Sequence, residues 1–322
     1  IAAVAALNQF RQRLAADPAL RGVLLGTPVK VSYRVAAEEA ALAKAVRDGP
    51  PPPGAPVPEP PPASVTSVAK EIRASLSVSS NPAYNFTVDL AGVEQLHDLM
   101  WNAGLPSVRL RHRLSLFGLS NKDQRTTARL VFQLPQGEVE LVPERIASRR
   151  VPAHGRARPG VGLFRKEGRE LVPGPKDFSE KNSVSLMDMA RLTAWIADPA
   201  LAPELSFPLL EPEDRTLLRQ SMSFLHPDWE EWMPLRVGMV EVIPGDDLLY
   251  LHKSGMAYGF YLDVGYVEQK STGRAFMIAV AAHLNPNNVI NDGQYGYKTM
   301  GNPMMRDLGR QLARELLAKE GK

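Results

Sequence analysis

The chain has 322 residues, 44% of them hydrophobic, so it is long enough to bury the core of one large domain or of two modest ones. Its 38 Lys and Arg residues nearly balance 35 Asp and Glu residues, and no basic tract is interleaved with aromatic residues, which argues against nucleic-acid binding. The absence of cysteine excludes disulfides, thiolate zinc sites and cysteine nucleophiles, and no apolar run is long enough to predict a membrane span.

The first part of the chain is predicted to be helical. Apolar residues recur at helical spacing over residues 1–14 without the Ser, Thr, Asp or Asn that normally begins a helix, so we expect this helix to start before Ile1. A second helix is predicted at residues 36–46. Residues 50–62 hold nine prolines in thirteen positions, which indicates either a domain boundary or a polyproline-like loop insertion over residues 50–63. We favour the insertion, because a helical pattern resumes directly after it.

Helices and hairpins alternate along the middle of the chain. Helical periodicity predicts helices at residues 65–76, 89–103, 183–197 and 213–222. Residues 128–146 are typical of a β-hairpin with a turn at Pro135-Gln136-Gly137, and residues 160–173 indicate a second hairpin. We interpret residues 126–182 as an accessory hairpin insert in a domain formed by residues 1–125 and 183–322.

The C-terminal third has the clearest pattern. Residues 248–252, 258–267 and 274–283 are predicted to form three consecutive strands joined by short turns. Residues 302–317 then place Met305, Leu308, Leu312 and Leu316 on one face of a closing helix. Antiparallel strands followed by a helix that packs on them predict an α+β fold, with an antiparallel sheet flanked by helices.

Two short motifs carry chemistry. The first, Ser79-Ser80-Asn81-Pro82-Ala83-Tyr84-Asn85, lies where a helix is predicted to end, and the second, His252-Lys253-Ser254-Gly255, lies on a predicted strand edge. The second motif offers a cation, a hydroxyl group and a glycine that lets a ligand lie flat along the strand. Taken alone, the first motif also fits a helix cap or Asx-turn, and the second fits a solvated strand end.

In this order and these settings, the two motifs resemble the S-x-N and K-[TS]-G motifs of the serine β-lactamase and penicillin-binding protein superfamily. The resemblance covers about residues 1–125 and 183–320 and is closest to class A β-lactamase-like hydrolases. It implies a β-lactamase-like fold with an inserted β-hairpin subdomain. It also implies a serine hydrolase that cleaves a small-molecule or peptide-like amide or ester through an acyl-enzyme, without a cofactor or metal, in a periplasmic or secreted location.

The resemblance also assigns roles to individual residues. Ser79 and Lys253 would relay protons, and Asn85 would brace the loop that carries the first motif. The substrate would be bound by Asn81, Ser254, Gly255 and the backbone N–H of Met256, which would form half of an oxyanion hole.

The attacking serine of the family stands in an S-x-x-K motif that opens a buried helix well before S-x-N. Residues 1–14 resemble the continuation of that helix, so we expect the serine and its lysine just upstream of Ile1. Ser67-Val68-Ala69-Lys70 matches the pattern, but it lies within the predicted helix at residues 65–76, only twelve residues before Ser79. We therefore do not favour Ser67 as the nucleophile.

The group that would release an acyl-enzyme is also missing from its expected place. Penicillin-hydrolysing relatives carry a glutamate shortly after an R-L pair, whereas after Arg109-Leu110 the nearest acid is Asp123. Slow turnover, or a carboxypeptidase, esterase or amidase relative, is therefore favoured over a true β-lactamase. His112 is either a substitute base or a surface residue. His97, His154, His226 and His283 lack the spacing of metal ligands.

Two other interpretations stay open on the sequence. The chain could be a non-catalytic binding or scaffold module that has kept the fold and lost the chemistry. It could also be an unrelated α+β protein in which both motifs occur by chance. The substrate and the oligomeric state are not specified by any pattern in the sequence.

Overall fold

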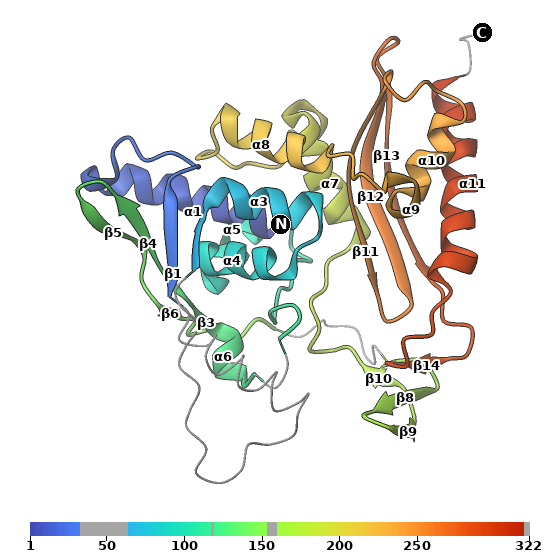
Figure 1. The fold of residues 1–322 in the computed structure, drawn as a ribbon, viewed down its shortest axis with the longest axis horizontal. Coiled ribbons are helices and arrows are strands. Elements are labelled where there is room, and N and C mark those ends of the chain that lie inside the picture. The colour runs from blue at the N-terminus through green and yellow to red at the C-terminus, as the bar shows by residue number, and fades with distance from the viewer. Residues whose placement is uncertain (33–63, 117–118, 153–159, 319–322) are drawn as a thin grey trace. The chain divides into compact units, whose positions relative to one another are not determined.

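A computed structural model describes residues 1–32, 64–116, 119–152 and 160–318 of the chain (Figure 1). The predicted helix at residues 36–46 and the proline-rich segment at residues 50–63 lie outside the described residues. The chain divides into two compact units, which are described one at a time: residues 1–152 with 206–218, and residues 153–205 with 219–322.

Helices form the core of the first unit around the N-terminal helix. Its helices are α1 (Ala2–Ala16), α3 (Val68–Ser77), α4 (Asn81–Ala91), α5 (Val93–Asn102) and α6 (Asn121–Arg125), with a short 3₁₀ turn at Pro18–Leu20. Leu7 and Phe10 of α1 are fully buried, as are Ile72 of α3 and Leu90 of α4. The helix predicted at residues 1–14 is confirmed, and α1 packs on α4 and α5 through its apolar face.

Two predicted helix boundaries were wrong. The helix predicted at residues 89–103 is two helices, because Gly92 has φ +80° and ends α4 before α5 begins. Any side chain at Gly92 would collide with that of Gln95. The helix predicted at residues 65–76 starts only at Val68, because the residues before it pair with a neighbouring strand.

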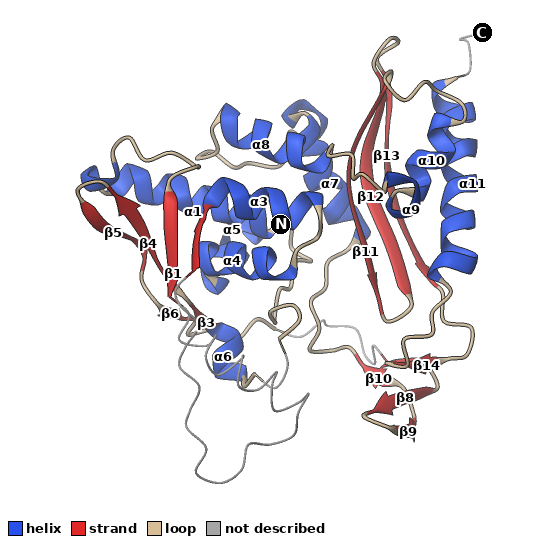
Figure 2. Cartoon of the chain, in the orientation of Figure 1, coloured by secondary structure: helices blue, strands red, loops and turns tan. Residues whose placement is uncertain are grey.

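A four-stranded antiparallel sheet completes the first unit (Figure 2). Its order is β2-β1-β4-β5, with β1 (Pro28–Ser32), β2 (Ser64–Ser67), β4 (Arg129–Leu134) and β5 (Gly137–Val142). Val29 of β1 lies opposite Phe132 of β4, whose buried ring contacts that of Phe10 at a centroid distance of 6.2 Å. The first predicted hairpin therefore exists as β4 and β5, and it belongs to the same sheet as β1.

A later segment returns to the first unit. Residues 206–218 include the start of α8 (Pro212–Met222), which confirms the helix predicted at residues 213–222. Arg11 of α1 donates from Nε and Nη2 to the two carboxylate oxygens of Asp214, both at 2.8 Å, and also contacts Glu213. Asp214 is fully buried, so this bidentate pair fixes the segment on α1.

The second unit is built on a three-stranded antiparallel sheet. Its order is β11-β12-β13, with β11 (Leu248–Ala257), β12 (Phe260–Gln269) and β13 (Arg274–His283), so the three predicted strands are confirmed. The first strand is longer than predicted, because the ladder continues through the Lys253 motif to Ala257. β11 lies at an edge of this sheet.

Helices cover both faces of the sheet of the second unit (Figure 1). They are α7 (Leu186–Ala197), α9 (Trp229–Trp232), α10 (Pro234–Val240) and α11 (Asn302–Leu312), which a π-helical turn at Ala313–Leu317 extends. One face buries Tyr250, Val267 and Ile278 with Leu235 and Met305 of α10 and α11, and α7 packs on the other face. The helices predicted at residues 183–197 and 302–317 are confirmed, and so is the predicted α+β class.

Two glycines allow α10 and α11 to approach each other closely. A Cβ atom at Gly238 would lie 1.8 Å from the carbonyl oxygen of Arg306, and one at Gly309 would lie 2.1 Å from that of Leu235. Any larger residue at either position would force the two helices apart.

The described residues also form short strands in both units. They are β3 (Thr126–Thr127), β6 (Arg145–Ile146), β7 (Gly160–Val161), β8 (Phe164–Glu167), β9 (Glu170–Pro173), β10 (Lys176–Asp177) and β14 (Val289–Ile290). β8 and β9 form the second predicted hairpin, and β14 pairs with β8 in parallel. Residues 126–182, predicted as one insert, divide at residue 152 between the two units. Among the described residues, no helix has the length and apolar character needed to cross a membrane.

Candidate functional site

The first motif forms a tight turn between α3 and α4. Ser79 is exposed and has φ +53°, a left-handed conformation that is uncommon for residues other than glycine. Ser80 caps α4 by accepting a hydrogen bond from the N–H of Ala83 at 3.3 Å, and its own N–H donates to the Ala74 carbonyl. The backbone therefore holds Ser79 at the surface in a strained conformation, which is a feature of functional sites.

Asn81 and Asn85 lie one turn apart on α4 and bind the same neighbouring segment. The amide of Asn81 donates to the hydroxyl oxygen of Ser115 at 2.6 Å. The amide of Asn85 donates to the Leu114 carbonyl at 3.0 Å and accepts from the Leu114 N–H at 2.9 Å. Asn85 is buried, so these two bonds satisfy a backbone that would otherwise need water.

Asp89 continues this row one turn further along α4. Its Oδ1 accepts hydrogen bonds from Arg113 Nη2 at 2.6 Å and from the Ala128 N–H at 2.9 Å. Arg113 also donates to the Thr126 carbonyl. Asp89 and Arg113 are 0% and 5% exposed, so the pair is a desolvated ion pair that ties α4 both to residues 113–115 and to the start of β4.

His97 supports the segment that carries the R-L pair. Its Nδ1 donates to the Val93 carbonyl at 2.6 Å, and its Nε2 accepts from the Leu110 N–H at 3.0 Å, which defines the Nδ1-protonated neutral tautomer. Burial lowers the pKa of His97, so the ring stays neutral at physiological pH. Arg109 stacks on the ring of Trp101 at 4.9 Å.

The candidate bases for acyl-enzyme release occupy structural positions. Asp123 accepts from the N–H and the hydroxyl of Ser120 in a capping box at the start of α6, and these hydrogen bonds lower the pKa of its carboxyl group. His112 donates from Nδ1 to the Arg113 carbonyl at 2.7 Å. The Asp123 carboxylate is therefore committed to the helix cap, and the His112 ring is bonded to the backbone of the next residue.

Ser67 caps the start of α3, whereas the sequence predicted that it lies inside a helix at residues 65–76. Its hydroxyl oxygen accepts a hydrogen bond from the Lys70 N–H at 3.3 Å and caps α3, while its backbone pairs with Pro28 of β1. This S-x-x-K match is therefore explained by helix capping.

The second motif lies inside the edge strand β11. Lys253 is half-buried, and its ammonium group donates to the Ser254 carbonyl at 2.6 Å. Burial lowers the pKa of Lys253 from its ordinary value of 10.5, and the charge of Asp263 opposes that shift. Gly255 follows, and Met256 is 42% exposed beside it. The four residues thus present a cation, a hydroxyl group and an open strand edge in sequence.

A polar cluster that sequence reasoning missed lies on the face of β11 that carries Ser254, opposite to the Lys253 side chain. Asp263 of β12 is 2% exposed and pairs in register with Ser254. It accepts from the Tyr250 hydroxyl at 2.9 Å and contacts His252 Nδ1 at 3.1 Å, and the rings of Tyr250 and His252 stack at 4.5 Å. Burial, and then the charge and hydrogen bond of Asp263, raise the pKa of Tyr250 well above 10. The Ser254–Asp263 register would have revealed this cluster, but the register depends on strand pairing that no local sequence pattern shows.

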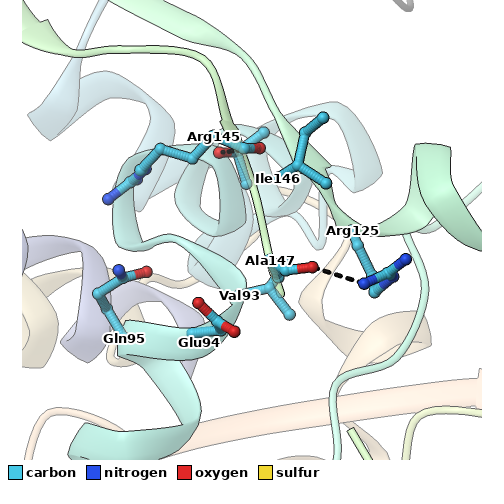
Figure 3. A pocket seen from close by; sticks show the side chains of 8 residues that line it. Val93, Glu94, Gln95, Arg125, Arg145, Ile146 and Ala147 are labelled. Carbon is cyan, nitrogen blue, oxygen red and sulfur yellow. Dashed lines mark hydrogen bonds between the residues drawn. The ribbon is translucent and has the colours of Figure 1, made fainter. Parts of the chain in front are cut away.

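A pocket in the first unit contains none of the predicted site residues (Figure 3). It is lined by Val93, Glu94, Gln95, Arg125, Thr127, Arg145, Ile146 and Ala147. Arg125 is bonded to the Ala147 carbonyl at 2.6 Å, and Arg145 donates to the carbonyls of Asp89 and Leu90. The arginines of this pocket thus hold the backbone of the first unit together.

The predicted site residues form two groups, one in each unit. Ser79, Asn81 and Asn85 lie together on the turn and first half of α4, and residues 253–256 lie together on β11. Within the described ranges, no group of His, Cys, Asp or Glu side chains is arranged to hold a metal ion.

Comparison with known proteins agrees with the fold. A model of the beta-lactamase enzyme family matches residues 45–316. A class A beta-lactamase from Bacteroides cellulosilyticus is similar over 97% of this chain and 80% of its own, with 11% identity and a TM-score of 0.50. Beta-lactamases from Francisella tularensis and Streptosporangium roseum are 12% and 15% identical, over 97% of this chain and 84% and 81% of theirs, with TM-scores of 0.49 and 0.48. No curated protein matches the chain.

Proposed function

Because the chain belongs to the beta-lactamase enzyme family, we propose that it is a serine hydrolase that cleaves an amide or ester through an acyl-enzyme. The observation that carries the proposal is Lys253. This lysine stands on an open strand edge next to Ser254 and Gly255, and burial lowers the pKa of its ammonium group. A desolvated cation of this kind is suited to stabilise negative charge and to assist proton transfer.

In this proposal, each motif residue has one task. The Ser79 hydroxyl passes a proton to the leaving group, and Lys253 assists that transfer. Ser254 binds an anionic group on the leaving side of the substrate, and the Met256 N–H stabilises the oxyanion. The Asn81 amide binds the substrate amide, which requires it to share or exchange its bond to Ser115. We expect the attacking serine in an S-x-x-K motif outside residues 1–322, and we expect the protein to act outside the cytoplasm.

The proposed enzyme releases its acyl group slowly. The segment from Arg109 to Leu116 contains no carboxylate, and Asp123 is held in the Ser120 capping box. Without a placed base to activate water, deacylation loses the contribution of about 10²–10⁴-fold that general-base catalysis supplies. We therefore expect a long-lived acyl-enzyme with penicillins and faster turnover only with more reactive esters.

The test uses the natural gene product, including the residues that precede Ile1. Its intact mass is measured before and after incubation with a penicillin or a p-nitrophenyl ester, and the adduct is located by peptide mapping. We expect a single acyl adduct on a serine upstream of Ile1. A Lys253→Met variant should form it about 100-fold more slowly, and a Lys166→Met control should form it at the normal rate. A folded protein that gains no adduct with either reagent would contradict the proposal.

One observation favours a second candidate, a non-catalytic module with this fold. The Asn81 amide is already bonded to the Ser115 hydroxyl at 2.6 Å, and Asn85 is fully engaged with Leu114. Both asparagines therefore act as structural braces in the described chain. If the protein forms no adduct but binds a peptide-like ligand reversibly, this second candidate is supported.

A further inference from the structure

The turn that joins β11 to β12 holds a tyrosine in a strained conformation. Tyr258 has φ +53° and Gly259 has φ +83°, so both residues of this two-residue turn are left-handed. Such turns favour Asn, Asp or Gly at the first position, and a bulky side chain there carries a steric penalty. Strain of this kind persists where surrounding contacts fix the residue, and it is common at ligand-binding sites.

The contacts that fix Tyr258 come from the segment at β10. The ring of Phe178 meets the Tyr258 ring edge-on at a centroid distance of 5.1 Å. The ammonium groups of Lys176 and Lys181 lie 5.8 Å and 5.6 Å from the centre of the same ring. β10 lies beside this end of the β11–β12 hairpin in Figure 1. Two cations from one loop therefore converge on one aromatic side chain.

The two ammonium groups have no anionic partner in the described part of the chain. Neither Lys176 nor Lys181 forms an ion pair with a described carboxylate. The adjacent Asp177 accepts instead from the N–H and hydroxyl of Ser179, at 2.7 Å and 2.9 Å, and Glu180 precedes Lys181 in the same loop. Two like charges that gather without a counter-charge repel each other, and a bound anion would remove that repulsion.

A buried amide beside the turn is a second, independent indication of a ligand. Asn285 is 7% exposed, and neither its amide nitrogen nor its carbonyl oxygen has a hydrogen-bond partner among the described residues. Its Cβ atom packs directly against Gly259. Because buried polar side chains are nearly always hydrogen-bonded, this amide indicates a polar group that binds next to the turn.

The direction of β11 relates this cluster to the proposed chemistry. In the proposed function, Ser254 binds the leaving side of the substrate and the Met256 N–H binds the acyl oxygen. The strand therefore runs from the leaving side to the acyl side, and Tyr258 lies two residues beyond Met256, about 7 Å further along. Within the described residues, β11 has a strand partner on one side only, so its other edge can pair with an extended peptide-like chain, whose acyl portion then runs out over Tyr258.

We propose that Tyr258, Lys176 and Lys181 form a subsite for a carboxylate on the acyl portion of an extended, peptide-like substrate. This inference rests on the proposed function. It adds a substrate class, in which the acidic residue stands two residues before the residue whose carbonyl is attacked. The tyrosine ring supports the peptide, and the lysines neutralise its carboxylate.

The test measures binding separately from chemistry. Two unreactive peptides, acetyl-Glu-Gly-Ala-amide and acetyl-Gln-Gly-Ala-amide, differ only in one carboxylate, and their dissociation constants are measured by NMR titration of the full-length protein. We expect the Glu peptide to bind about five-fold more tightly, as for a partly exposed ion pair, and less so at high salt. A Lys176→Met/Lys181→Met double variant should lose this preference. The variant Lys166→Met, which removes a charge from exposed β8, should keep it.

The same pair of peptides as p-nitrophenyl esters separates the two hypotheses. If the Glu preference in binding depends on the two lysines but no ester acylates a serine, the subsite stands and the hydrolase proposal fails. If both esters acylate a serine at equal rates and the amides bind equally, the hydrolase stands and the subsite is wrong. A preference that survives in the double variant, or no binding of either peptide, also overturns the subsite.

Discussion

Removing one partner of the buried ion pair between Asp89 and Arg113 should cost the first unit several kcal/mol of stability. The change to make is Asp89→Asn, which keeps the shape of the side chain and an oxygen that can accept from the Ala128 N–H. What it removes is the negative charge 2.6 Å from the Arg113 guanidinium. The two side chains are 0% and 5% exposed, so water cannot take the place of the carboxylate.

Breaking one side of a buried pair costs about 3–5 kcal/mol, since the remaining charge is left desolvated. We expect a value near the lower end, because Arg113 keeps its bond to the Thr126 carbonyl. A second variant that adds Arg113→Met to Asp89→Asn removes the stranded charge and should recover part of the loss. The matched control is Glu140→Gln, which breaks the exposed pair with Arg129 and should cost at most about 1 kcal/mol.

The assay is urea unfolding, combined with hydrogen exchange to assign the change to a region. Peptides from α4 and β4 should lose protection in Asp89→Asn, whereas peptides from the sheet of the second unit should keep theirs. If Asp89→Asn and Glu140→Gln have the same free energy of unfolding within error, the pair contributes no more than a surface ion pair and the reasoning from burial is refuted.

Three further changes test other parts of the structure. Gly309→Ala sets a Cβ atom 2.1 Å from the Leu235 carbonyl oxygen and should cost about 1–3 kcal/mol in thermal unfolding. The control Gly26→Ala, whose Cβ atom would have no atom within 4 Å, should leave the stability unchanged. Equal effects of the two substitutions would contradict the close approach of α10 and α11. Asn85→Ala removes two hydrogen bonds and should cost about 2 kcal/mol in urea unfolding. Asn85→Asp keeps the acceptor but sets a buried carboxylate against the Leu114 carbonyl, so it should cost at least as much, and an unchanged urea midpoint in both variants would contradict the brace. Burial lowers the folded pKa of Lys253 below its unfolded value of 10.5, so its ammonium group opposes folding at neutral pH, and this penalty disappears as the pH rises from the folded pKa to 10.5. Lys253→Met should therefore be more stable than the wild type near neutrality, by a margin that shrinks toward pH 10.5; a margin independent of pH would show that Lys253 keeps its ordinary pKa.

Sequence patterns predicted the elements wherever an apolar period was long and uninterrupted. The C-terminal strands and α11 are of this kind. β11 was predicted to end at His252 because the polar residues that follow break the apolar pattern, although backbone pairing with β12 continues to Ala257. The break at Gly92 was not predicted, because the apolar pattern of α4 continues into that of α5 with only this residue between them.

The candidate site was predictable only in its motif residues. The spacing of Asn81, Asn85 and Asp89 by four residues shows in the sequence that one face of α4 is polar. Its partners at residues 113–115 cannot be read from any local pattern, because they are set by how the loop folds back. The contacts of Asp263 could not be read from the sequence either, because they depend on strand register. Those of Lys176 and Lys181 with Tyr258 depend on a segment that returns to the β11–β12 turn.

Because Arg11 bonds to Asp214, the packing of α1 can be completed only after a segment far along the chain has been synthesised. The two residues are 203 positions apart, and Asp214 fills a fully buried place against α1. At ~5–20 residues per second, α1 leaves the ribosome roughly 10–40 s before the segment that completes its packing. During that interval the nascent first unit exposes the surface that residues 206–218 later cover. A chaperone that binds nascent chains would therefore find its longest-lived target on this face of α1, and slow codons before residue 206 would lengthen the exposure.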